Sequence, residues 1–399
     1  MFQATKRVRT IEYAIRDIIV HAKNAEKKGK KIIYLNIGDP VKYDFDTPEH
    51  IKQALFSAVK EGSNWYSPSE GLQELREAIC EKEKRVNGVE ILPENVIVTA
   101  GVSEAIQMVM AAIVDEGTEI LVPDPSYPPY VSYVNFFGGT PVPYKTVEEN
   151  GWQPDIDDLE SKISDKTRGI VVINPNNPTG ALYSKKTVKK IVDLAGEHDI
   201  PLLSDEIYDR IIYEKEFVSA SHIAEDVPVI GLNGFSKTYL MTGWRLGYVY
   251  FHDSDGQLSE LKECVEKEAR IRLCANTPIQ KAAAAALRGP ETHIKEMVKK
   301  LRERRDYSWK RLNKIEGISC AKPEGAFYVF PKVNGVGSEW KTDEQFVLQL
   351  LEETGVLVVH GSGFGVPHGV GHFRGVILPP IETLEVAFDK LEQFMSKHM

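Results

Sequence analysis

Over roughly its first two thirds, the chain alternates short apolar runs with amphipathic stretches. The runs GIVVIN at residues 169–174 and IPLLS at residues 200–204 are continuously apolar, and segments with helical periodicity separate such runs. Continuous apolar strands that alternate with helices are typical of a mostly parallel sheet covered on both faces. The pattern predicts strands at residues 95–100, 119–122, 169–174, 200–204, 227–232 and 244–251, and helices at residues 71–85, 103–114 and 184–197.

The pattern changes after residue 251. Helical stretches at residues 258–273 and 291–312 flank the alanine-rich run AAAAALRG. Beyond them come three apolar strands (AFYVF, GVLVVH and HFRGVIL), an intervening helix and a C-terminal helix at residues 382–397. We therefore expect a second, smaller α+β domain, joined through a hinge in the helical stretch around residues 255–300. The first 35 residues read as a charged, partly helical arm.

Composition excludes several classes of protein. The chain has 399 residues, 42% of them hydrophobic and 27% charged, which is typical of a globular protein with a large core. Its 49 basic and 58 acidic residues give a net charge of −9, which argues against nucleic-acid or anionic-membrane binding. The four cysteines form no C-x-x-C pair, so we expect reduced thiols in a cytoplasmic protein. No signal peptide and no apolar stretch of about 20 residues is visible.

A glycine- and histidine-rich segment near the C-terminus resembles cofactor and metal motifs only superficially. GSGFG at residues 361–365 lacks the G-x-G-x-x-G spacing, and Pro367 blocks the helix that should follow. His368 and His372 have a helical metal-ligand spacing, but two of the residues between them are glycines. An ordinary loop is therefore favoured, and we expect no metal.

Four segments with unusual polar residues each follow a predicted strand or begin within one. Ligands of doubly wound sheets bind at the carboxyl ends of the strands, so these segments are candidates for one site. They are TAGVSEAIQ (99–107), NPNNPTG (174–180), SDEIYD (204–209) and GFSKTYLMTGWRLG (234–247).

Each of the first three segments has a functional and an ordinary interpretation. A helix begins at Gly101, Val102 and Ser103. Its free backbone amides could bind a phosphate; in the ordinary interpretation, Ser103 only caps the helix. Asn177 lies in a loop that two prolines make rigid, or in an ordinary turn. Asp205 ends an apolar run, and a carboxylate at the end of a buried strand is costly unless a ligand or side chain pairs with it. In the ordinary interpretation, Asp205 caps a helix.

Cationic residues complete the set. Lys237, in a partly desolvated cleft, would have a lowered pKa and act as a nucleophile; otherwise it is a solvated surface charge. Arg245 follows eight residues later, and Arg374 stands inside an apolar strand, where it suits a carboxylate, a phosphate or a structural ion pair. Together the groups match what pyridoxal phosphate requires: an anion site for its phosphate, a carboxylate for its ring nitrogen, donors for its ring oxygen and a lysine for its aldehyde.

The ordered motifs LNIGDP, YSPSEGLQELREAI, NPNNPTG, SDEIY, FSK with GWRLGY, and FRG resemble the class I and II aminotransferases of fold type I almost from end to end. The segments EYAIRD, VKYDFD, WQPDIDDL, ARIRLCANTP and HGSGFG are most similar to alanine aminotransferases of the archaeal type. The resemblance implies an α/β fold with a mostly parallel seven-stranded sheet. It also implies an N-terminal arm (1–45) packing with the small domain, a large cofactor-binding domain (46–285) and a small C-terminal α+β domain (286–399).

The resemblance also implies roles by position. Lys237 resembles the lysine that holds pyridoxal 5'-phosphate and moves the substrate proton, and Asp205 resembles the partner of the ring nitrogen. Tyr208 and Asn177 resemble the donors to the ring oxygen, and Tyr127 resembles the aromatic residue stacked on the ring. The implied phosphate cradle is Gly101, Val102, Ser103, Ser236 and Arg245, and the implied clamp for the substrate α-carboxylate is Gly38, Asn177 and Arg374.

Tyr66 resembles a tyrosine that reaches the phosphate of the neighbouring subunit, which implies a homodimer with shared sites. Gly234 departs from the family, because many relatives have a phosphate-binding serine there. The implied reaction is ping-pong transfer of an amino group between alanine and 2-oxoglutarate, giving pyruvate and glutamate. Alternatives are an aspartate or aromatic aminotransferase, a carbon–sulfur β-lyase on the same scaffold and, least favoured, a cofactor-bound transcription regulator. The sequence names no residue for the distal carboxylate of glutamate; the arm and the partner chain are the candidates.

Overall fold

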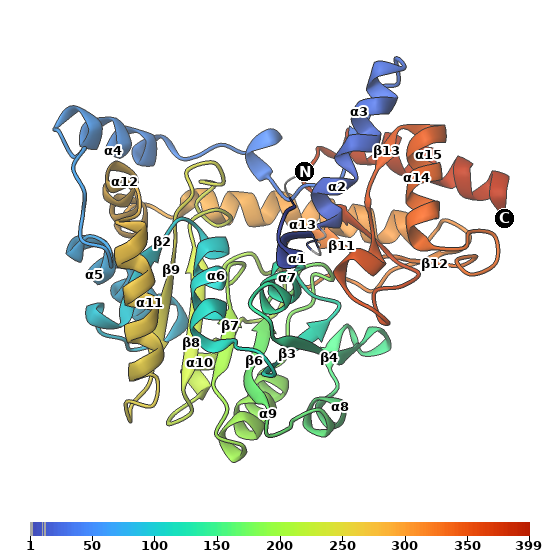
Figure 1. The fold of residues 1–399 in the computed structure, drawn as a ribbon. Coiled ribbons are helices and arrows are strands. Elements are labelled where there is room, and N and C mark those ends of the chain that lie inside the picture. The colour runs from blue at the N-terminus through green and yellow to red at the C-terminus, as the bar shows by residue number, and fades with distance from the viewer. Residues whose placement is uncertain (1–2, 10, 12) are drawn as a thin grey trace.

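The computed structural model describes residues 3–9, 11 and 13–399. In this part of the chain, an eight-stranded sheet with helices on both faces lies beside a smaller group of strands and helices (Figure 1). The sheet consists, in spatial order, of β2 (Val96–Thr99), β9 (Gly247–His252), β8 (Val229–Gly234), β7 (Leu202–Asp205), β6 (Thr167–Ile173), β3 (Glu119–Asp124), β4 (Thr140–Val147) and β5 (Gln153–Pro154).

Among the described residues, six strands of this sheet share one direction and two oppose it. β3 pairs in parallel with β4 and β6, and the parallel order continues through β7 and β8. β9 is antiparallel to both β8 and β2, and β5 is antiparallel to β4. The mostly parallel sheet is confirmed. It has eight strands rather than seven because the short β5 pairs with the end of β4 through two residue pairs.

Alternate strand residues pack on opposite layers of helices, which explains the continuous apolar runs. Val171 and Leu203 belong to a core cluster on one face, whereas their neighbours Ile170 and Leu202 belong to a cluster on the other. The first face is covered by α6 (Val102–Ile113), α7 (Pro129–Phe136) and α11 (Ser259–Arg272); the second by α9 (Lys185–Glu197), α5 (Gln73–Lys82) and α12 (Thr277–Arg288).

All six predicted strands are present, with shifted ends. β9 begins at Gly247 rather than at residue 244, because Arg245 has φ +57°, a left-handed conformation that interrupts extended backbone. The sequence pattern missed α4 (Glu49–Lys60) and β4. The β4 sequence TPVPYKTV contains two prolines, which lack the backbone N–H donor, and prolines in a run argue against assigning a strand from sequence.

The C-terminal part contains a three-stranded antiparallel sheet in which β15 lies between β11 and β14. The short β1 of the N-terminal arm pairs in parallel with β13, so the arm joins this part of the molecule. The elements are β1 (Ile33–Tyr34), β11 (Tyr328–Val329), β13 (Val356–Leu357), β14 (Val359–His360), β15 (Phe373–Val376), α13 (Thr292–Leu312), α14 (Asp343–Thr354) and α15 (Ile381–His398).

The division into an arm (1–45), a large domain (46–285) and a small domain (286–399) remains a proposal. The second limit falls near the end of α12, just before the long helix α13 that leads into the C-terminal part (Figure 1). Over the described ranges, no helix is both long enough and apolar enough to cross a membrane.

Candidate active site

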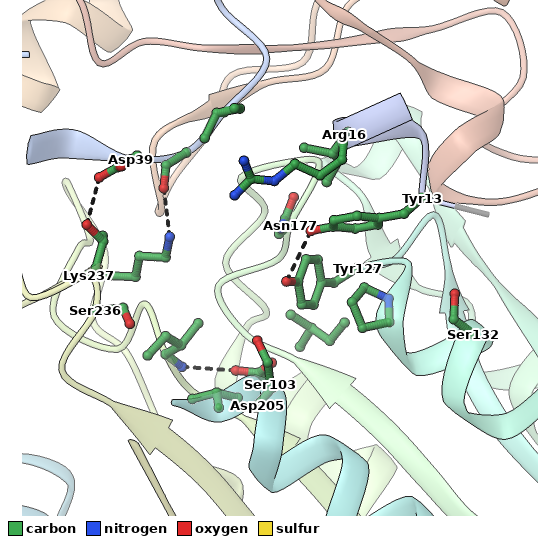
Figure 2. A pocket seen from close by; sticks show the side chains of 18 of the residues that line it. Tyr13, Arg16, Asp39, Ser103, Tyr127, Ser132, Asn177, Asp205, Ser236 and Lys237 are labelled. Carbon is green, nitrogen blue, oxygen red and sulfur yellow. Dashed lines mark hydrogen bonds between the residues drawn. The ribbon is translucent and has the colours of Figure 1, made fainter. Parts of the chain in front are cut away.

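The four candidate segments meet at one edge of the sheet. β2, β6, β7 and β8 run in parallel, so their carboxyl ends share that edge, and the antiparallel β9 begins there. A pocket of about 720 Å³ opens at this edge (Figure 2). The predicted residues among its lining are Gly38, Val102, Ser103, Tyr127, Asn177, Asp205, Tyr208, Ser236, Lys237, Arg245 and Arg374.

Lys237 lies just beyond β8 and extends into the pocket. Its Nζ donates a hydrogen bond to the Gly38 carbonyl oxygen at 2.7 Å (Figure 2). Burial lowers the pKa of Lys237 to about 8; the positive charges of Arg374 and Arg245 act in the same direction, while Asp39 and Asp205 oppose them. A substantial fraction of this amine is therefore neutral near physiological pH, as a nucleophile or a base requires.

Asp205 is the last residue of β7 and is 3% exposed. Its Oδ2 accepts a hydrogen bond from the Tyr130 hydroxyl at 2.8 Å, and its Oδ1 accepts one from the Ile207 amide at 3.2 Å. Burial nevertheless raises the pKa of Asp205 to about 6. Tyr130 was missed by the sequence analysis, which selected only Tyr127 from PSYPPY although the motif contains both tyrosines.

Arg374 lies on β15 and is 1% exposed. Its Nη1 donates to Asn177 Oδ1 at 2.9 Å, and its Nη2 donates to the Asn36 carbonyl oxygen. The guanidinium lies over the Tyr328 and Phe364 rings, 4.7 and 4.6 Å from their centroids. Its Nε lacks a hydrogen-bond partner and no carboxylate pairs with the side chain within the described residues. The arrangement suits a planar anion, and the structural ion pair considered above is not found there.

The N-terminus of α6 and Arg245 form a second anion-binding surface. The first helical amides, at Val102 and Ser103, precede the intrahelical hydrogen bonds, and the helix dipole favours negative charge there. Gly101 has φ +84°, and a Cβ at this position would lie 2.4 Å from Arg245 Nη2. In the part of the chain that is described, the Ser103 and Ser236 hydroxyls have no hydrogen-bond partner. Both are thus available to a ligand.

Tyr208 contacts a residue that sequence reasoning did not single out. Its hydroxyl oxygen lies 2.6 Å from that of Tyr328, on β11 of the C-terminal part. A Cβ at Gly38 would lie 2.5 Å from the Tyr328 hydroxyl oxygen, so only glycine fits beside this tyrosine. The sequence feature that could have indicated Tyr328 is its hydroxyl, the only polar side-chain group in the apolar run AFYVF.

The N-terminal arm supplies one wall of the pocket. The Tyr13 hydroxyl lies 3.3 Å from the Tyr127 hydroxyl (Figure 2). Arg16, on α2 (Ala14–Asp17), is exposed and extends into the pocket above Asn177 (Figure 2). No other described residue pairs with its guanidinium. Sequence reasoning named neither residue, although both belong to the quoted motif EYAIRD.

Three predicted features lie outside the pocket lining: Gly101, described above, Tyr66 and Gly234. Tyr66 is 79% exposed and does not line the pocket of its own chain. Gly234 ends β8, and a Cβ there would lie 3.0 Å from Gly247 Cα. A serine at position 234 would therefore crowd the adjacent strand, whose backbone would have to move by a few tenths of an ångström.

Comparisons with known proteins agree on one family. The sequence profile of aminotransferase class I and II matches residues 30–391. The solved alanine aminotransferase of Pyrococcus furiosus is 59% identical, with a TM-score of 0.97, covering 99% of this chain and 100% of that one. The glutamate-pyruvate aminotransferase AlaA of Escherichia coli is 37% identical over 99% of this chain and 98% of its own. Aromatic-amino-acid aminotransferase 2 of Thermococcus litoralis is 40% identical over 92% of each chain.

Proposed function

The chain belongs to the class I and II aminotransferases, and we propose that it exchanges the amino group between alanine and 2-oxoglutarate, giving pyruvate and glutamate. The observation that carries the proposal is that Lys237, Asp205 and Arg374 face one pocket with the charges and pKa shifts that this chemistry needs. The similarity to an alanine and a glutamate-pyruvate aminotransferase over nearly the whole chain supports this pair of substrates.

The pocket fits pyridoxal phosphate as the cofactor. The amides of Val102 and Ser103, the free hydroxyls and Arg245 suit its phosphate, and the missing Cβ of Gly101 leaves room for Arg245. Asp205 is a buried carboxylate with no cation bound to it among the described residues, and a protonated ring nitrogen would supply that charge. When bound, pyridoxal phosphate supplies an aldehyde that captures amino groups and a ring that accepts the electron pair released at the substrate Cα.

The chain's own residues position the reactants and move one proton. Lys237 Nζ, whose pKa burial lowers to about 8, would accept the proton from the substrate Cα and donate it to the cofactor carbon that was the aldehyde carbon. Asp205 holds positive charge at the ring nitrogen. Asn177 turns its Oδ1 to Arg374, so its Nδ2 is free to donate to the cofactor's ring oxygen, and Tyr208 donates alongside it. Tyr127 provides an aromatic surface for the ring.

Arg374 binds the α-carboxylate that all the substrates share. Its Nε has no other partner in the described chain, and Asn177 and Gly38 lie beside it. This clamp cannot distinguish alanine from other donors, so selectivity comes from the rest of the pocket. A methyl-sized difference in an apolar pocket contributes only about 1–3 kcal/mol, so we expect modest selectivity among small donors.

Glutamate and 2-oxoglutarate need a second cation for their distal carboxylate. Arg16 supports this role, because its guanidinium enters the pocket from the arm and has no partner among the described residues (Figure 2). Alanine needs no such group. Arg16 therefore lets one pocket accept a monocarboxylic and a dicarboxylic substrate in turn.

The active form is a homodimer with shared sites. Trp65 and Tyr66 are 52% and 79% exposed, and Ile271 and Leu273 are 85% and 54% exposed. Thr277 Oγ1 donates to the Trp65 carbonyl oxygen at 2.7 Å, so these apolar side chains belong to neighbouring segments. Exposed apolar surface of this kind is typical of an interface, and it supports the role of Tyr66 at the partner's phosphate site.

The substrate assignment is tested by kcat/KM of the holoenzyme for alanine, aspartate and phenylalanine, each with 2-oxoglutarate as acceptor. We expect alanine to give the highest value. A preference of more than about tenfold for aspartate or phenylalanine would refute the alanine assignment. It would leave the aminotransferase class untouched.

The role of Arg16 is tested by Arg16→Ala, with Arg9→Ala in the same arm as a control. Loss of charge-assisted hydrogen bonds worth about 1.5–3 kcal/mol should raise KM for 2-oxoglutarate roughly 10- to 100-fold. KM for alanine should stay within about threefold of wild type, because alanine has no distal carboxylate. An equal rise for both substrates, or a similar effect of the control, would disprove the assignment.

A further inference from the structure

Tyr328 lies in the middle of the site, yet none of the steps above uses it. It is 2% exposed and lines the pocket. Its hydroxyl oxygen lies 2.6 Å from that of Tyr208, and the Arg374 guanidinium lies over its ring. It comes from β11 of the C-terminal part, whereas Tyr208 follows β7 of the central sheet. Tyr328 therefore bridges two parts of the chain that are far apart in sequence.

The direction of the hydrogen bond between the two hydroxyls follows from where their protons can go. At 2.6 Å one hydroxyl must donate to the other. If Tyr208 donated, its proton would lie between the two hydroxyl oxygens. The Tyr328 proton would then have no acceptor among the contacts of the described residues. If Tyr328 donates, its proton is used and the Tyr208 proton is free to point into the pocket. With the cofactor's ring oxygen facing Tyr208, only the second arrangement uses both donors.

We propose that Tyr328 is a positioning residue that donates its hydroxyl proton to Tyr208 and so aims the Tyr208 proton at the ring oxygen of the cofactor. The inference rests on the proposed function, because it assumes that the cofactor's ring oxygen faces Tyr208. Consecutive hydrogen bonds polarise one another, so Tyr208 becomes a stronger donor than an isolated tyrosine. A stronger donor stabilises negative charge on the ring oxygen.

The fit around Tyr328 places its hydroxyl where this role requires it. The absent Cβ of Gly38 leaves the space that the hydroxyl occupies. The Tyr328 ring packs on Phe327, with centroids 4.9 Å apart, and on the Tyr208 ring, at 5.8 Å. Burial raises the pKa of both tyrosines, so both remain protonated donors near neutral pH. Titratable or charged groups around the pair include Arg374, Asp205, Tyr127 and Tyr13, and Lys237 lines the same pocket.

The test is the pH dependence of cofactor absorption in the holoenzyme, measured without substrate. The absorption of pyridoxal phosphate bound to Lys237 changes with protonation. Hydrogen bonds donated to the ring oxygen stabilise the negative charge that it carries in the deprotonated form, and so hold the midpoint low. Tyr328→Phe removes the hydroxyl and keeps the ring beneath Arg374. We expect the midpoint to rise by about 0.3–0.7 pH units, while KM for alanine stays within about threefold of wild type.

Two comparisons separate this role from a structural one. Tyr213→Phe is the matched control, because the buried Tyr213 hydroxyl donates to the Ala326 carbonyl two residues before Tyr328 and does not contact Tyr208. It should leave the midpoint unchanged. In a Tyr208→Phe background, Tyr328→Phe should add no further shift. A shift that persists in this background would mean that Tyr328 contacts the cofactor directly and would overturn the proposal, as would an equal shift in the control.

Gly38→Ala gives a second perturbation if the Tyr328 variant folds poorly. Because the Gly38 carbonyl oxygen also accepts from Lys237, the shift is compared with that of Gly38→Ala in a Tyr208→Phe background, where the part that acts through Tyr208 should disappear. The added methyl group would displace the Tyr328 hydroxyl, so the midpoint should again rise. Absence of any shift in both variants would overturn the proposal. Wild-type protein that shows neither cofactor absorption nor transamination would instead refute the proposed function. The two failures are therefore distinguishable.

Discussion

Lys237 should react with acylating reagents at a pH at which an ordinary lysine is still protonated. Burial lowers its pKa to about 8, against about 10.4 for a free lysine side chain. At pH 7.5 about a quarter of the Lys237 amines are then neutral, compared with about 0.1% for the free side chain. The reactive fraction is thus roughly 200-fold larger.

The assay is competitive acylation of the apoenzyme over a range of pH, with the peptide that contains Lys237 quantified by mass spectrometry. Nα-acetyl-lysine in the same tube serves as the reference. We expect a midpoint near 8 for Lys237, and loss of labelling when pyridoxal phosphate is added. A midpoint close to that of the reference would refute the argument that burial makes this amine reactive.

Charged neighbours should move that midpoint in opposite directions. Asp39 raises the pKa of Lys237, so Asp39→Asn should lower the midpoint. Arg245 lowers it, so Arg245→Gln should raise the midpoint. Because burial is the largest cause, each shift should be smaller than the difference between Lys237 and the reference. Shifts of the same sign in both variants would contradict this account of the site's electrostatics.

The remaining predictions concern the other residues of the site. Lys237→Ala should reduce transamination by several orders of magnitude, and borohydride reduction of wild-type holoenzyme followed by peptide mapping should label Lys237 alone. Asp205→Asn should cripple turnover yet stabilise the apoenzyme by up to about 3 kcal/mol above pH 6, because the raised pKa of Asp205 makes its ionised form costly there. This gain in free energy of unfolding should vanish below about pH 4, where the wild-type carboxyl is protonated in both states, and thermal melts across pH would show it. Hybrids of Lys237→Ala and Tyr66→Phe chains should regain activity, whereas mixtures of Lys237→Ala with Arg374→Lys should show no such gain, as steady-state assays of mixed dimers would reveal.

Asp205 and Lys237, two of the pocket residues that we propose face the cofactor, could be predicted because each stands at or just beyond the end of a strand. Asp205 ends β7 and Lys237 stands three residues beyond β8, and the parallel order of these strands fixes which edge both reach. The sequence pattern alone sufficed for the strands, because burial on both faces makes their apolar runs continuous. Arg245 is a partial exception: its place was predicted, but the left-handed backbone that turns it toward Gly101 was not.

The residues that were missed come from elements whose positions depend on packing rather than on local pattern. Tyr328 belongs to a strand of two residues, and Arg16 to a helix of four. Elements this short have no periodicity to read, and tertiary contacts hold them in place. The Arg16 segment is held partly by Asn36, whose side-chain amide donates to the Ile15 carbonyl oxygen at 3.3 Å.

The same physical cause acts on both sides of the pocket, with opposite consequences for charge. Burial lowers the pKa of Lys237 to about 8 and raises that of Asp205 to about 6, so each group is pushed toward its neutral form. The two shifts reflect charge that the described chain leaves only partly compensated, and Arg374 adds a buried guanidinium with a spare donor. A ligand that brings a cation to Asp205 and anions to Arg245 and Arg374 offsets all of these costs at once. These buried and only partly compensated charges therefore specify a ligand of mixed charge, which is the pattern of pyridoxal phosphate together with an amino acid.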